Sequence, residues 1–200
     1  AAERGLPSNT VLPGLRRYVE QSRQMLPLVV ALRNPNMQPG HYERVDQAMG
    51  MVLPRGENLT VGVCLEVGLH THCNLVAKIS GDATQEATLR EMIEKVRQQW
   101  EATEFATKPF KDSRDATVLG AVDDVLQTLE ETQLVMQSVM GSPYVTALHS
   151  DAEAWHKKLQ LFSDVLDEWL ACQRSWMYLE SIFAAPDLQR QLPAELKMFQ

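Results

Sequence analysis

The sequence predicts a mainly α fold, an elongated multi-helix arm with one small β-hairpin and a long C-terminal helix. Three observations predict it. Apolar side chains recur every three or four residues over much of the chain, which places them on one side of a helix. No glycine or proline occurs between Tyr144 and Ala185, so one helix can run through this segment. Residues 103–119 instead show two short runs around a polar turn, which is typical of a hairpin.

The first quarter of the chain predicts two helices separated by a loop. Val11–Leu32 is mainly apolar at helical intervals, and Pro27 inside it predicts a kink or a short break near Met25. A loop rich in asparagine and proline follows. His41–Met49 then predicts a short helix that Gly50 closes.

Residues 59–69 give conflicting signals. Gly62 and Gly68 weaken a strand and a helix alike. Six apolar side chains nevertheless alternate strictly, which favours a strand on periodicity alone: Leu59, Val61, Val63, Leu65, Val67 and Leu69.

Helical spacing returns in the middle of the chain. Asp82 with Gln85 predicts the N-terminal cap of a helix whose apolar face ends at Trp100. After the hairpin, residues 122–140 predict a further helix, which the Gly-Ser-Pro sequence at 141–143 stops. The chain then reverses into the long C-terminal helix.

That last helix, expected from about Val145 to Phe183, would be on the order of 55–60 Å long at a rise of roughly 1.5 Å per residue. One apolar stripe follows it at alternating four- and three-residue spacing: Leu148, Ala152, Trp155, Leu159, Phe162, Leu166, Trp169, Gln173 and Trp176. Only Gln173 interrupts the stripe. On spacing alone its three tryptophans are core, and truncating a fully buried Trp169 would cost roughly 3–5 kcal/mol.

Composition and charge argue against several function classes. A net charge of −7 disfavours a nucleic-acid surface, which needs clustered basic side chains. No apolar run approaches the roughly 20 residues that cross a membrane. Cys64, Cys73 and Cys172 are odd in number and lack CxxC spacing, which fits reduced thiols in the cytosol.

No catalytic site, cofactor site or metal site is expected. Gly56 and Gly62 have the glycine separation of a phosphate-binding loop, but no lysine follows them. His70 and Cys73 could share a helix face, yet two ligands do not make a closed zinc site. Adjacent acidic residues on a helix point about 100° apart and favour a solvated face over acid–base chemistry.

The C-terminal part of the chain also carries a specific string of residues: Trp155, the pair Glu168-Trp169, Gln173-Arg174-Ser175-Trp176, Tyr178-Leu179-Glu180, Ile182-Phe183, Asp187, and Gln191-Leu192-Pro193 with Glu195 and Phe199. This string resembles the linker region of dynein heavy chains. A weaker match covers nearly all of the remaining chain. Gly40-His41-Tyr42 stands where the family usually shows Arg-His-Trp, so contacts inferred at the first and third positions are in doubt. Arg33-Asn34-Pro35 and Ala184-Ala185-Pro186-Asp187 look more like axonemal than cytoplasmic heavy chains.

The resemblance implies a mostly helical arm over a ring of AAA+ modules, helical also at 59–69, whose bending and straightening moves the motor against its cargo. The arm itself would hydrolyse nothing, because ATP and Mg belong to the ring elsewhere in the parent chain. Its implied partners are that ring and, through the rest of the parent, other dynein chains and microtubules. The implied location is cytoplasmic and cytoskeletal, in the axoneme of a cilium or flagellum.

We therefore expect residues 1–200 to be the N-terminal part of a linker, a fragment of a much larger chain. The expected parts are a helical subdomain (1–101), the hairpin (102–120) and a helix pair (121–200). The alternative is a non-motor helical scaffold such as a spectrin-like repeat protein, although the two halves of the chain do not align. Eight residues are expected to stiffen the arm and transmit force: Trp100, Trp155, Phe162, Trp169, Trp176, Tyr178, Leu179 and Phe183.

Overall fold

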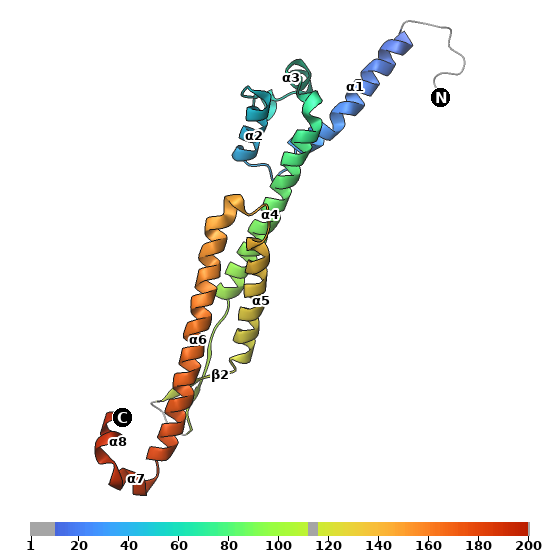
Figure 1. The fold of residues 1–200 in the computed structure, drawn as a ribbon. Coiled ribbons are helices and arrows are strands. Elements are labelled where there is room, and N and C mark those ends of the chain that lie inside the picture. The colour runs from blue at the N-terminus through green and yellow to red at the C-terminus, as the bar shows by residue number, and fades with distance from the viewer. Residues whose placement is uncertain (1–10, 112–115, 200) are drawn as a thin grey trace. The chain divides into compact units, whose positions relative to one another are not determined.

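A computed structural model describes residues 11–111 and 116–199, and the mainly α fold with one hairpin is confirmed for this part of the chain (Figure 1). The polar turn expected between the strands falls mostly on residues 112–115, outside the described residues. The elements are α1 (Val11–Leu32), α2 (Pro39–Met49), α3 (Val61–Glu66), α4 (Cys73–Glu101), β1 (Ala106–Pro109), β2 (Thr117–Gly120), α5 (Asp123–Met140), α6 (His149–Phe183), α7 (Pro186–Gln191) and α8 (Pro193–Phe199).

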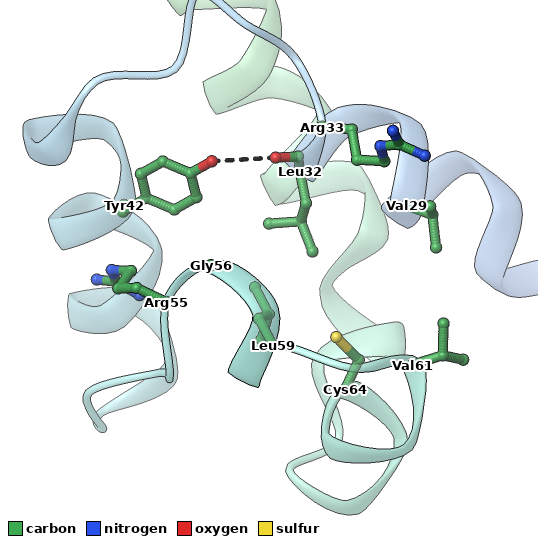
Figure 2. A pocket seen from close by; sticks show the side chains of 9 residues that line it. All are labelled: Val29, Leu32, Arg33, Tyr42, Arg55, Gly56, Leu59, Val61 and Cys64. Carbon is green, nitrogen blue, oxygen red and sulfur yellow. Dashed lines mark hydrogen bonds between the residues drawn. The ribbon is translucent and has the colours of Figure 1, made fainter.

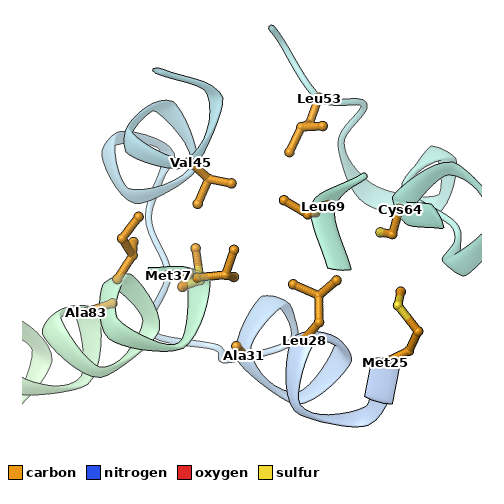
Figure 3. Packing of buried hydrophobic residues seen from close by; sticks show 11 residues of the cluster. Met25, Leu28, Ala31, Met37, Val45, Leu53, Cys64, Leu69 and Ala83 are labelled. Atoms are coloured by element: carbon orange, nitrogen blue, oxygen red, sulfur yellow. The ribbon is translucent and has the colours of Figure 1, made fainter. Parts of the chain in front are cut away.

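The chain forms two compact units, Ala1–Arg90 (unit 1) and Glu91–Gln200 (unit 2), whose boundary falls inside α4. The hydrophobic core of unit 1 gathers around the C-terminal part of α1 (Figure 3). Leu28, Leu69 and Val76 are fully shielded from solvent there, because residues of α1, of the turn after α3 and of α4 point toward one another. The subdomain boundaries expected at 101 and 120 stay a prediction.

Helix α1 continues through Pro27, so the short break expected near Met25 is wrong, while the alternative of a kink there stays a prediction. The conflict at residues 59–69 resolves in favour of a helix, and the strand that strict alternation favours is wrong. Thr60 caps α3, since its Oγ1 accepts a hydrogen bond from the Val63 N–H at 3.3 Å. Gly68 ends the segment with a φ of 72°, which is the left-handed conformation that glycine adopts without steric cost.

The helix start expected at Asp82 is wrong, because α4 already begins at Cys73. The Asp82 carboxylate does not cap a helix; it accepts a hydrogen bond from Arg44 of α2 at 2.6 Å. Gly81 lies in the first third of α4, where a Cβ would meet open space, so nothing in its surroundings requires glycine. Asp82 therefore has the side chain of a helix cap but uses its carboxylate in a contact between α2 and α4.

Polar side chains fasten the loop between α1 and α2 onto α4. The Asn34 amide donates to the Ser80 carbonyl oxygen at 2.8 Å and to the Thr84 hydroxyl at 2.9 Å. Buried His41 accepts the Gln38 N–H on Nδ1 at 3.0 Å, so its Nε2 carries the proton and donates to Glu86 at 3.1 Å. This histidine of the Gly40-His41-Tyr42 triplet is thus a satisfied structural residue.

In unit 2, α5 packs along α6, and the hairpin lies beside the C-terminal part of α6 (Figure 1). The strands are antiparallel, with Ala106 opposite Gly120 and Pro109 opposite Thr117. Two short helices that the sequence did not predict, α7 and α8, follow α6, and each begins at a proline. The buried positions of α5 and α6 repeat at helical spacing: Val125, Leu129, Thr132, Met136 and Val139, and Ala152, Leu159 and Leu166.

Candidate functional site

Three helices of unit 2 meet at Trp100, near the C-terminal end of α4. The indole Nε1–H donates to the Thr132 hydroxyl of α5 at 3.1 Å. The Phe162 ring of α6 packs against the same indole edge to face, with ring centroids 4.8 Å apart and planes inclined by 64°. The Trp100 side chain therefore packs its ring against Phe162 and donates its N–H to Thr132. Buried tryptophans usually combine an apolar contact with a hydrogen bond in this way.

Thr132 can serve as acceptor because its own proton is used within α5. Its hydroxyl donates to the Thr128 carbonyl oxygen at 2.7 Å, and the side chain is 2% exposed. The lone pair that faces Trp100 is thereby held in one orientation. Phe105, the residue before β1, stacks on the Phe162 ring of α6 with ring centroids 6.0 Å apart. These four residues, Trp100, Phe105, Thr132 and Phe162, are named the Trp100 cluster below.

Gln173 explains the polar interruption of the α6 stripe. Its Oε1 accepts the Leu119 N–H at 2.8 Å, and its Nε2 donates to the Leu119 carbonyl oxygen at 3.0 Å. Both main-chain groups of one residue of β2 are thus satisfied by a single amide side chain. A leucine at this place in the stripe would leave both groups without these partners.

Further contacts hold the hairpin and the C-terminal helices to α6. Phe110 meets Trp176 edge to face with centroids 5.1 Å apart, and Lys111 forms an ion pair with Glu180. Phe199 of α8 stacks on Trp176 at 6.2 Å and contacts Phe183 at 5.1 Å. Trp176 is therefore in contact with the hairpin region, which precedes α6 in the sequence, and with α8, which follows it.

The structure brings together some of the residues expected to transmit force and leaves others apart. Trp100 and Phe162 share one cluster, while Trp176 and Phe183 share another through Phe199. Trp155 is half-buried and touches the Lys158 side chain, whose Nζ lies 5.1 Å from the ring centroid. Four residues of these contacts were not among the eight expected: Thr132, Phe105, Phe110 and Phe199. Phe199 belongs to the dynein-like string, and Thr132 falls at helical spacing from the apolar residues of α5 and could have been found.

Burial was expected for the whole tryptophan stripe and is wrong for Trp169, which is 58% exposed. Tyr178 and Leu179 are also exposed. The fully buried residues of α6 recur every seven residues at Ala152, Leu159 and Leu166, so they form the row that faces α5. Trp169 lies in the adjacent row, where it borders the hairpin residues Phe105 and Leu119 but stays mostly open to solvent.

Unit 1 contains a cavity of about 330 Å³ between α1, α2 and α3 (Figure 2). Tyr42 borders it, donates its hydroxyl to the Leu32 carbonyl oxygen at 3.0 Å, and packs under the Arg55 guanidinium. Arg55 also binds the Asp46 carboxylate and holds the pKa of Asp46 below its ordinary value. Buried Cys64 lies on the opposite wall, and desolvation raises the pKa of its thiol, which disfavours the reactive thiolate.

Within residues 11–111 and 116–199, no three His, Cys, Asp or Glu side chains are placed to hold a metal ion together. None of the helices in these ranges combines the length and the hydropathy that crossing a membrane requires.

Comparison with known proteins identifies the family. Residues 2–200 match the family described as Dynein heavy chain, N-terminal region 2. The chain is 40% identical over 198 residues to human Dynein axonemal heavy chain 6, covering 98% of this chain and 5% of that protein. It is 34% identical over 186 residues to mouse Dynein axonemal heavy chain 1 and 30% identical over 190 residues to human Dynein axonemal heavy chain 2, covering 93% and 94% of this chain and 4% of each relative. The chain thus spans about a twentieth of the length of the curated relatives it matches, and it belongs to the dynein heavy chain family.

Proposed function

We propose that this chain is part of the linker of an axonemal dynein heavy chain, the lever arm that transmits ATP-driven rearrangements of the AAA+ ring to the cargo-binding tail. Family membership and the axonemal type of the relatives support an axonemal dynein motor. The length of α6 supports a mechanical role. At 1.5 Å per residue, the 35 residues of α6, all in unit 2, span about 52 Å.

The Trp100 cluster is the observation that carries the proposal. A lever arm must bend at a hinge and resist bending elsewhere, so its helices must not slide past one another. Packed aromatic side chains resist sliding because their contact area is large and protein interiors deform little. A directional hydrogen bond from α4 to α5, and ring contacts from α4 to α6, join three helices at one level.

The remaining parts of the function belong to the parent chain. ATP and Mg act in the AAA+ ring, and the residues of this fragment contribute stiffness while the ring supplies the chemistry. The partners are that ring and, through the rest of the parent, other dynein chains and microtubules. The place of action is the cytoskeleton of a cilium or flagellum. Family membership favours this motor role over the spectrin-like scaffold.

A full-length heavy chain carrying Phe162→Ala tests the proposal. If the cluster stiffens a lever, the variant should hydrolyse ATP at nearly the rate of the parent but drive microtubule gliding several-fold more slowly. Leu134→Ala on α5 is the matched control, because Leu134 is 66% exposed and should leave both rates unchanged. Gliding that is unaffected by Phe162→Ala, or that falls only in proportion to ATPase activity, would contradict the proposal.

A further inference from the structure

One side of α6 exposes three large apolar side chains at four-residue spacing, Leu161, Val165 and Trp169, with exposed fractions of 64%, 54% and 58%. Residues four apart lie above one another on a helix, so the three form one continuous strip. They are named the Trp169 strip. Scattered exposed apolar residues are ordinary on protein surfaces, whereas a contiguous row with a large aromatic residue marks an interaction site.

Two apolar hollows flank Trp169. The first, of about 190 Å³, lies between Trp169, Val165 and the hairpin residues Phe105 and Leu119. The second, of about 240 Å³, lies on the other side of the indole and includes Cys172. Each hollow exceeds the roughly 30 Å³ share of a water molecule several-fold, so each can receive an apolar side chain. The indole therefore stands as a ridge between two places where a partner can insert.

The far edge of the strip is acidic. Asp164 and Glu168 are both exposed, and each precedes a residue of the strip by one position, which places them together along its border. Asp164 accepts a hydrogen bond from the Gln160 amide at 3.1 Å. Within the part of the chain that the structure describes, neither carboxylate forms an ion pair. A partner that covers the strip with apolar side chains would therefore bring Lys or Arg to this border.

We propose that the Trp169 strip is the docking site of an amphipathic helix from the same heavy chain, outside residues 1–200, with basic residues beside its apolar face. About nineteen twentieths of the length of the two relatives, human Dynein axonemal heavy chain 6 and mouse Dynein axonemal heavy chain 1, lies outside the matched region. Three exposed apolar side chains offer far less than the roughly 800 Å² per partner that separate proteins bury in a stable complex. A segment of the same chain does not need that area, because covalent connection supplies a high effective concentration. The inference does not depend on the lever role.

Site-specific photo-crosslinking in the full-length heavy chain tests this docking. The photoreactive residue p-benzoylphenylalanine takes the place of Val165, whose exposure allows the exchange without disturbing the core, and crosslinked peptides are identified by mass spectrometry. We expect a crosslink to a peptide of the same heavy chain outside these 200 residues, with apolar residues three or four apart and Lys or Arg between them. Crosslinks to a second copy, to another polypeptide, or to nothing would overturn the proposal.

Charge reversal tests the acidic border. Asp164→Lys with Glu168→Lys should lower the crosslink yield about threefold or more, since two surface ion pairs are replaced by repulsion. Asp167→Lys is the matched control, because two residues along a helix turn its side chain about 200° away from Val165. Equal crosslink yields in the reversed and control variants would overturn the proposed charge recognition.

Discussion

Replacing Thr132 by valine tests the hydrogen bond that joins α4 to α5. Valine keeps the shape of threonine, so no cavity forms, but the Trp100 Nε1–H loses the acceptor that lies at 3.1 Å. A net hydrogen bond contributes about 0.5–1.5 kcal/mol, and a partly buried donor without a partner adds to the loss. The bond from Thr132 to the Thr128 carbonyl oxygen matters less, because helical carbonyls already accept a main-chain N–H. We expect unit 2 to lose about 1–2 kcal/mol in its free energy of unfolding.

Urea unfolding followed by tryptophan fluorescence measures this change, because all four tryptophans of the chain lie in unit 2. The loss corresponds to a fall in the urea midpoint of roughly 0.5–1 M for a denaturant slope of about 2 kcal/mol per molar. A double-mutant cycle with Trp100→Phe isolates the bond, and we expect a coupling energy of about 1 kcal/mol. A coupling below about 0.3 kcal/mol would refute the reasoning, because the two side chains would then act independently.

Three further predictions concern other contacts. Trp169→Ala should change the unfolding free energy of the 200-residue chain by no more than about 0.5 kcal/mol, whereas Leu166→Ala, 3% exposed, should cost about 2–5 kcal/mol in the same urea assay. Because Arg55 lowers the pKa of Asp46, this carboxylate should stabilise unit 1 above the ordinary aspartate pKa and lose its contribution as the pH falls through the lowered value. NMR titration of Asp46 checks the direction, and a pKa at or above the ordinary value would contradict it. Gln173→Leu should cost about 1–3 kcal/mol by leaving two main-chain groups unpaired, and an unchanged urea midpoint would show that water replaces the amide.

Much of the fold could be predicted from local sequence. Helical spacing and stop signals predicted α2, α5 and α6, because a cap or turn residue ends a helix within a few residues of its own position. The start of α4 was misplaced because Asp82 has the chemistry of a cap but uses its carboxylate on Arg44 of another helix. At residues 59–69 alternation was misleading, since a six-residue helix is too short for periodicity to distinguish it from a strand.

The candidate site was less accessible to sequence reasoning. Spacing placed Phe162 and Trp169 on one stripe, but which member is covered depends on where α5, α4 and the hairpin lie against α6. Gln173 interrupts the apolar stripe, and only the position of Leu119 of β2 beside it explains the amide side chain. Contacts between residues more than fifty positions apart leave no local signal in a single sequence.

A structure of the full-length heavy chain in two nucleotide states tests the central claim most directly. The account predicts that residues 91–200 superpose as one body in both states, with the Trp100 and Phe162 rings in contact, while this body changes position over the AAA+ ring. The account would be contradicted if unit 2 kept the same position in both states, or if the contact between Trp100 and Phe162 opened as the arm moved.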